Sequence, residues 1–365
     1  MSSGRDLVDL LTMTRGLNGS DLHLSVGAPP VARVDGALVP LGDELLEPKE
    51  CREFIMSVLT ESERSRLEKN WELDFALQIR DVGRFRGNAH FSRGNLEAAF
   101  RYVPSEVPDL ETLGHGPTVR DFCRARQGLV LVTGMAGAGK STTLAAMTAQ
   151  ILNERNGVVT TIEDPIEFTF PHATSLIKQR QIGMDTQDFA KALKAAVRQD
   201  VDVVVVSEMR DQESVAAALT AAETGHLVIS TLHSRGSIGS LDRMVDIFPA
   251  AQQPQIITQL AGTLVGIVHQ KLLPRADIPG RVMASEVMVL TPALSAVIRD
   301  HRFEQIYGLM QVSAVHGMHT MDNSLLHLLK GGFISLENAL LHARDVALLK
   351  ADFQEWLRTT ERAKR

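Results

Sequence analysis

Residues 128–154 read "GLVLVTGMAGAGKSTTLAAMTAQILNE", in which an apolar run passes through a glycine-rich turn into a helical pattern. A continuous apolar run is typical of a strand buried on both faces, as in parallel sheets covered by helices. The turn matches G-x-x-x-x-G-K-[ST], whose glycines let successive backbone N–H groups surround phosphate oxygens. This stretch therefore predicts a strand, a phosphate-binding loop and a helix, in that order.

Strand and helix patterns continue to alternate after this stretch. Apolar runs are separated by segments whose apolar residues recur at helical spacing, which is typical of parallel βαβ units. We therefore predict an α/β fold around a parallel sheet, followed beyond residue 235 by mostly helical chain with one more strand at 282–290. The predicted strands are "VVTTIED", "VDVVVVSE" and "HLVISTLH", and the predicted helices between them are "DFAKALKAAVRQ" and "QESVAAALTAAETG".

The chain before residue 108 has a different pattern. Residues 19–41 alternate apolar and polar side chains between Gly and Pro, which indicates strands joined by turns. Residues 47–70 have helical spacing, and "ELDFALQI", "GRFRGNAHF" and "LEAAFRYVP" indicate three short strands. Pro and Gly are concentrated in "PSEVPDLETLGHGP". We therefore predict a small α+β domain at 1–108, a linker at 109–117 and the α/β domain at 118–365.

Composition excludes several classes of protein. A net charge of −6 and a pI near 6.1 give no overall basic field, so nucleic acid is not a predicted partner. Two cysteines, Cys51 and Cys123, cannot build a disulfide framework or a four-cysteine zinc site. The N-terminal stretch "MSSGRDLVDLLTMTRGLNGSD" lacks the pattern of a signal peptide, and no apolar run reaches the ~18 residues of a spanning helix. We therefore expect a soluble cytoplasmic protein.

The glycine-rich turn predicts a site for ATP and Mg²⁺. Lys140 would reach the β- and γ-phosphates, and the Ser141 hydroxyl would be a ligand of Mg²⁺. The alternative is a glycine-rich turn without a ligand, but the strand, lysine, serine and helix all stand where a phosphate-binding loop needs them. The predicted nucleotide-binding residues are Gly134, Met135, Ala136, Gly137, Ala138, Gly139, Lys140, Ser141 and Thr142.

Carboxylates and a histidine follow the other predicted strands. Ligands of such sheets bind beyond the carboxyl ends of the strands, where Glu208, Glu163 and Glu167 follow theirs. Glu208 could hold Mg²⁺ or its water, although pairing with Arg210 is the plain alternative. Glu163 or Glu167 could orient or deprotonate the attacking water. His233 could hydrogen-bond the γ-phosphate.

Four motifs now stand in one order: "GMAGAGKST", "TIEDPIEF", "VVVVSEMRD" and "TGHLVISTLHS". Their order resembles the type IV pilus retraction ATPases, the twitching motility proteins of the secretion-type ATPase superfamily. The resemblance covers nearly the whole chain and implies a homohexamer with a PAS-like N-terminal domain and a RecA-like core. It further implies that Glu167 is the catalytic glutamate and Glu163 a second one, that Glu208 is the Walker B glutamate, that His226 and His233 are the two family histidines, and that Arg86 and Arg101 approach the nucleotide.

The resemblance also implies partners and leaves alternatives open. Retraction ATPases act on an inner-membrane pilus platform protein from the cytoplasmic side, and a paralogous retraction ATPase is a possible partner. A pilus assembly or type II secretion ATPase is the first alternative. Those relatives carry a four-cysteine zinc motif, which this chain with its two cysteines cannot form. A weakly active regulatory ring subunit is the second, because Ser207 and "PALSAVIRD" (292–300) depart from the family pattern.

Overall fold

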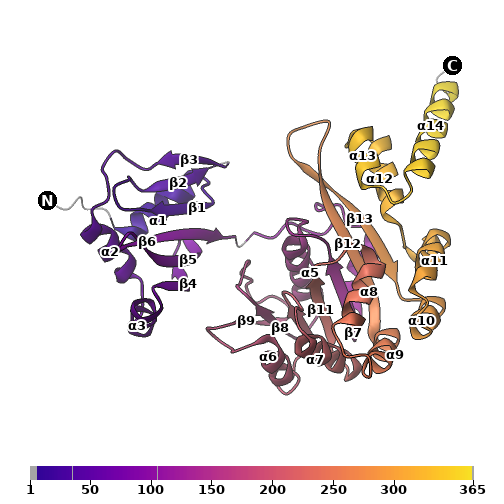
Figure 1. Cartoon of the computed structure of the whole chain (residues 1–365), viewed down its shortest axis with the longest axis horizontal. Coiled ribbons are helices and arrows are strands. Elements are labelled where there is room, and N and C mark those ends of the chain that lie inside the picture. The colour runs from indigo at the N-terminus through magenta and orange to yellow at the C-terminus, as the bar shows by residue number, and fades with distance from the viewer. Residues whose placement is uncertain (1–5, 35, 105, 364–365) are drawn as a thin grey trace. The chain divides into compact units, whose positions relative to one another are not determined.

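The computed structural model describes residues 6–34, 36–104 and 106–363 (Figure 1). The first five residues of the N-terminal stretch analysed above lie outside the described residues. The chain forms two compact units. One contains the residues up to Glu106 together with Glu167–Thr169, and the other contains Val107–Ile166 and the chain from Phe170 onward. This division falls two residues before the predicted domain end at 108.

The N-terminal unit is an antiparallel sheet packed against helices. Its elements are α1 (Leu7–Gly16), β1 (Asp21–Leu24), β2 (Val31–Val34), β3 (Ala37–Pro40), α2 (Pro48–Ser57), α3 (Glu61–Asn70), β4 (Glu72–Ile79), β5 (Gly83–Ser92) and β6 (Asn95–Val103). The strands are ordered β3-β2-β1-β6-β5-β4, so the first and last strands of the predicted set meet in the middle of the sheet.

The helix predicted at 47–70 is two helices. Thr60 begins α3 with a reciprocal capping box, in which its hydroxyl accepts from the Glu63 N–H and the Glu63 carboxylate accepts from the Thr60 N–H. This cap begins α3, three residues after α2 ends at Ser57. The sequence analysis also missed α1, whose Leu7, Leu10 and Leu11 are buried at helical spacing.

The second unit is a mostly parallel sheet with helices on both faces. Its strands are β7 (Gly128–Thr133), β8 (Val158–Glu163), β9 (Leu176–Gln181), β10 (Val203–Val206), β11 (Leu227–Leu232), β12 (Leu264–Pro274) and β13 (Arg281–Val289), ordered β13-β12-β7-β11-β10-β8-β9. Every neighbouring pair is parallel except β12 and β13, which form an antiparallel hairpin.

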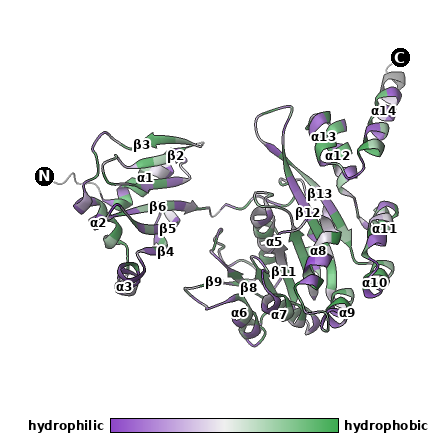
Figure 2. Ribbon diagram, in the orientation of Figure 1, coloured by the Kyte–Doolittle hydropathy of each residue, from purple (hydrophilic) through white to green (hydrophobic). Residues whose placement is uncertain are grey.

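The central strands are buried on both faces. Val203 and Val205 pack in one apolar cluster, and Val204 and Val206 pack in the cluster on the opposite face. Figure 2 shows the strands at the middle of this sheet in the colour of hydrophobic residues. The first cluster includes residues of α4 (Pro117–Arg124) and α5 (Lys140–Glu154), and the second includes residues of α6 (Phe189–Ala196), α7 (Gln212–Glu223), α8 (Gly236–Asp246), α9 (Gln253–Thr263) and α10 (Pro292–Arg299).

The chain beyond 235 differs from the prediction. The mostly helical stretch contains the long strand β12, which the sequence analysis missed together with β9. The valine strand was also predicted too long, since β10 ends at Val206, two residues before Glu208. The chain ends in α11 (Ile306–Val312), α12 (Met321–Lys330), α13 (Leu336–His342) and α14 (Val346–Ala363), with short 3₁₀ turns at Phe303–Gln305 and Ala314–His316. Within the described ranges, no helix combines the length and the apolar character needed to cross a bilayer.

Candidate nucleotide-binding site

The loop between β7 and α5 has the backbone of a phosphate cradle. Gly134 has a φ of +152°, and a Cβ there would lie 2.5 Å from the carbonyl oxygen of Gln270. Gly139 has a φ of +85° and is the N-cap of α5. Both positions therefore require glycine. The Gln270 amide donates from Nε2 to the Ala138 carbonyl at 2.7 Å, so β12 fixes the loop from the side.

This cradle is suited to an anion. Glycine at the N-cap has no side chain to satisfy the first amides of α5, so these N–H groups and the positive end of the helix dipole are available to phosphate. Lys140 is only 8% exposed, and its ammonium donates to the Gly134 carbonyl at 3.0 Å and the Met135 carbonyl at 3.1 Å. The ammonium thus lies over the loop that would hold the phosphates.

His233 joins the loop to Glu208. Its Nδ1 lies 3.4 Å from Lys140 Nζ, and its Nε2 lies 3.4 Å from Glu208 Oε1. The other carboxylate oxygen of Glu208 accepts a hydrogen bond from Arg210 Nε at 2.8 Å, and this bond raises the pKa of the arginine. The structure therefore brings three predicted residues together in one chain of contacts. The pairing of Glu208 with Arg210, predicted as the alternative to a role with Mg²⁺, is present as well.

The carboxylate of Glu208 and the hydroxyl of Ser141 are the predicted ligands of Mg²⁺. Ser141 is exposed in the first turn of α5, directly after Lys140. Carboxylate and hydroxyl oxygens are the donors that this hard cation prefers, and Mg²⁺ bound with a nucleotide takes few ligands from the protein. The donor set of this site therefore fits the ion.

Glu163 ends β8 at the same edge of the sheet. Its Oε1 accepts from Thr161 Oγ1 at 2.6 Å and from Gln179 Nε2 at 3.1 Å. The Ser207 N–H donates to the carbonyl of Ile162 at 2.9 Å, which places the end of β8 beside the chain that leads to Glu208. These two hydrogen bonds hold the carboxylate at the end of β8.

Three other predicted residues belong to the N-terminal unit. Arg86 and Arg101 are directly opposite each other on β5 and β6. Arg86 Nη2 lies 3.8 Å from the Asp74 carboxylate, and Arg101 Nε donates to Asp21 at 2.8 Å. Glu167 also groups with this unit. The roles of these residues toward a nucleotide remain predictions.

His226 lies at the opposite end of β11 from His233. Its Nδ1 is 3.1 Å from the Ala221 carbonyl, near the end of α7, and 3.4 Å from Thr224 Oγ1. These contacts hold the turn between α7 and β11.

The sequence analysis missed the residues that β12 and β13 contribute. Gln270 supports the phosphate-binding loop, and His269 and Glu286 contact the start of α8. A signal for His269 and Gln270 exists in "LVGIVHQK", where polar residues directly follow an apolar run, as Glu208 follows its valines. The mostly helical chain predicted beyond residue 235 conflicts with this signal, because the segment forms β12.

Comparisons with known proteins show the family of the chain. Residues 100–325 match the family model described as "Type II/IV secretion system protein". The chain is 41% identical over 334 residues to the type IV pilus retraction ATPase PilT of Pseudomonas aeruginosa, covering 92% of this chain and 97% of that protein. It is 36% identical over 334 residues to the type IV pilus ATPase PilU of the same organism, covering 92% and 87%.

A solved structure shows the same fold. The crystal structure of the pilus retraction motor PilT with bound ADP superimposes with a TM-score of 0.88 at 42% identity, covering 93% of this chain and 98% of that one. The predicted fold class, a RecA-like P-loop ATPase core with a smaller N-terminal domain, is thereby confirmed. The chain belongs to the type II/IV secretion system protein family and, within it, to the type IV pilus retraction ATPases.

Proposed function

We propose that this chain hydrolyses ATP with Mg²⁺ and that the reaction drives retraction of a type IV pilus. The observation that carries the proposal is the series of contacts from the phosphate-binding loop through Lys140 and His233 to Glu208. A loop that only bound phosphate would need no carboxylate and histidine beyond it. Hydrolysis needs both a cradle for the phosphates and groups that act where the water attacks.

The proposed reaction assigns a separate role to each predicted site residue. Lys140 and the first amides of α5 bind the phosphates and stabilise the charge that shifts during transfer. Ser141 and Glu208 would hold Mg²⁺, which when bound neutralises phosphate charge. His233, close to both Lys140 and Glu208, would hydrogen-bond a γ-phosphate oxygen. Glu167, or in its place Glu163, would orient the water and accept its proton.

The retraction role rests on the family to which the chain belongs. We propose a hexameric ring in which Arg86 and Arg101 of the N-terminal unit approach the nucleotide. Different contacts with ATP and ADP would then move one unit relative to the other, since a ligand shifts only equilibria between states that bind it differently. The ring would act on an inner-membrane platform protein from the cytoplasmic face, with a paralogous ATPase as a possible partner.

Purified protein is expected to hydrolyse ATP and to elute from a sizing column at the mass of a hexamer. Turnover should stop when EDTA removes Mg²⁺ and return when Mg²⁺ is added in excess. A colorimetric phosphate assay measures both. Tight nucleotide binding without measurable turnover would instead support the regulatory ring subunit, and a monomer that hydrolyses ATP at the full rate would contradict the ring.

A further inference from the structure

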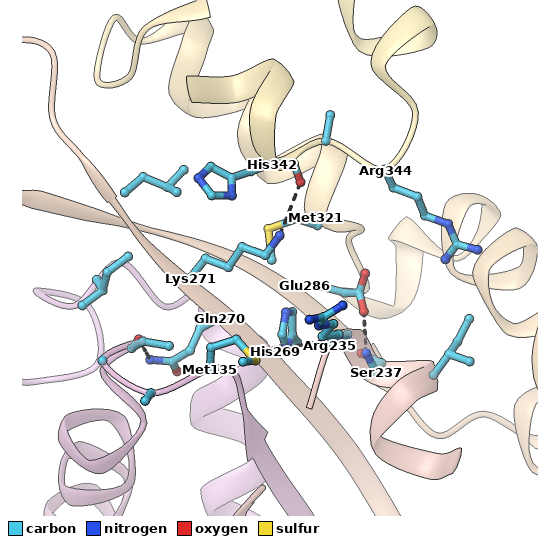
Figure 3. Close-up of a pocket in the computed structure, with 18 residues that line it drawn as sticks. Met135, Arg235, Ser237, His269, Gln270, Lys271, Glu286, Met321, His342 and Arg344 are labelled. Atoms are coloured by element: carbon cyan, nitrogen blue, oxygen red, sulfur yellow. Dashed lines mark hydrogen bonds between the residues drawn. The ribbon is translucent and has the colours of Figure 1, made fainter. Parts of the chain in front are cut away.

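The start of α8 is held by side chains from the β12–β13 hairpin. The Ser237 N–H donates to Glu286 Oε1 at 2.8 Å, and the Gly236 N–H donates to His269 Nδ1 at 3.3 Å. Figure 3 shows the Glu286–Ser237 hydrogen bond as a dashed line, and both residues line one cavity together with His269. The N-cap of α8 is Arg235, and arginine has no acceptor with which to cap a helix. The hairpin therefore supplies the acceptors that a local cap usually provides.

His269 links this helix start to the phosphate-binding loop. Its Nδ1 also lies 3.1 Å from Thr133 Oγ1, and Thr133 directly precedes Gly134. Burial lowers the pKa of His269 to about 4, so the ring is neutral near pH 7 and Nδ1 can be an acceptor. The Gly236 N–H and the Thr133 hydroxyl share the single lone pair of Nδ1, which lies between the start of α8 and the end of β7.

The chain between β11 and α8 is short. Leu232 ends β11 and Gly236 begins α8, so the loop that carries His233 consists of residues 233–235. Ser234 adds a hydrogen bond of 2.7 Å between its hydroxyl and that of Ser240, within α8. Only three residues separate the strand from the helix, and Ser234 is itself bonded to the helix. We therefore expect a shift of the first turn of α8 to move His233 relative to Lys140 and Glu208.

We propose that Glu286 and His269 are positioning residues for ATP hydrolysis, which hold His233 in place by fixing the first two amides of α8. The inference rests on the proposed ATPase function and adds to it residues outside the four motifs. Both act through the helix, Glu286 on the Ser237 amide and His269 on the Gly236 amide. Losing either should slow turnover more than it weakens nucleotide binding.

The strand that carries Glu286, β13, also contacts the C-terminal part of the chain. The Ser285 N–H donates to Ser324 Oγ at 3.0 Å, and the Ser285 hydroxyl lies 2.9 Å from His319 Nε2. The backbones of Val287 and His319 also pair. Glu286 lies between Ser285 and Val287 in the chain. These contacts fix the part of β13 that carries Glu286.

The test compares Glu286→Ala with the wild-type protein. We expect kcat for ATP hydrolysis to fall about ten- to a hundredfold, as small misplacements of catalytic groups do, while the Kd for a fluorescent ADP analogue changes less than about threefold. Glu286→Gln keeps an acceptor oxygen for Ser237 and should recover most of the lost kcat. Hydrogen exchange of the Gly236–Ser237 amides should speed up in Glu286→Ala even without nucleotide.

Asp322 provides the matched control. Like Glu286 it is a buried carboxylate that accepts backbone amides at a helix start, here Arg344 N–H at 2.7 Å and Asp345 N–H at 2.9 Å, just before α14. Asp322→Ala loses the same kind of bonds away from the phosphate-binding loop. It should lower the thermal midpoint of unfolding as Glu286→Ala does, yet keep kcat within about twofold of wild type.

Three results would overturn the inference. These are a folded Glu286→Ala that keeps wild-type kcat, a loss of kcat matched by an equal loss of nucleotide affinity, and an equal loss of kcat in Asp322→Ala. If Glu286→Ala does not fold, His269→Ala tests the other contact, and there too kcat must fall by more than nucleotide affinity. A wild-type protein without turnover would overturn the proposed function and this inference together, whereas unchanged turnover in the variants overturns the inference alone.

Discussion

Replacing Glu208 with glutamine is expected to lower kcat for ATP hydrolysis at least about a hundredfold and to leave nucleotide binding nearly unchanged. The carboxylate lies at the end of the contacts that begin at the phosphate-binding loop, with Oε1 3.4 Å from His233 Nε2. Glutamine has nearly the same shape but carries no charge, so it can neither balance Mg²⁺ nor retain the ion pair with Arg210. The cradle of backbone amides and Lys140 stays intact, and it supplies most of the binding.

Steady-state kinetics and a titration with a fluorescent ADP analogue measure the two effects separately. Glu213→Gln is the control, because Glu213 is an exposed carboxylate in the first turn of α7, a few residues along the chain. It should behave like the wild-type protein. Turnover above about a tenth of the wild-type rate in Glu208→Gln would defeat the role assigned to this carboxylate.

Lys140→Ala is expected to weaken ATP binding about a hundredfold or more, which corresponds to about 3 kcal/mol. The ammonium is nearly buried and lies over the loop, within 3.0 Å of the Gly134 carbonyl. An alanine there leaves the γ-phosphate charge without its nearest cation in a partly desolvated site. Hydrolysis should fall in parallel, because unbound ATP cannot react.

Equilibrium titration with ATP in the presence of EDTA isolates this contribution from that of Mg²⁺. Lys191→Ala is the comparison, since Lys191 is an exposed lysine on α6 that pairs with Asp188 at 3.1 Å. That variant should bind ATP as the wild-type protein does. An affinity within about threefold of wild type in Lys140→Ala would contradict the assignment of the loop as the phosphate site.

The centre of the site could be predicted because each of its residues follows an apolar strand. Glu208 and His233 come after "VVVV" and "LVISTL", and parallel strands present their carboxyl ends at one edge. That rule alone places both residues near the phosphate-binding loop. Their order in space, with His233 between Lys140 and Glu208, depends on β11 lying between β7 and β10, and sheet order is not readable from local pattern.

The supporting residues could not be predicted in the same way. The β12 segment "LVGIVHQKLLP" has three polar residues between two apolar runs, a pattern that is compatible with helix or strand, and only pairing with β7 and β13 decides between them. Glu286 is more than seventy residues from Glu208 in the chain, and only this hairpin brings it to α8. Long-range pairing therefore hid His269, Gln270 and Glu286, although each is a polar residue on a largely apolar strand.

The central claim is that the chain powers pilus retraction, and a deletion tests it most directly. Cells lacking the protein should carry more surface pili than wild type, counted by electron microscopy, and should not move by twitching. A plasmid carrying the wild-type gene should restore movement, and one carrying Glu208→Gln should not. Loss of surface pili in the deletion strain would contradict the account and would favour a pilus assembly ATPase.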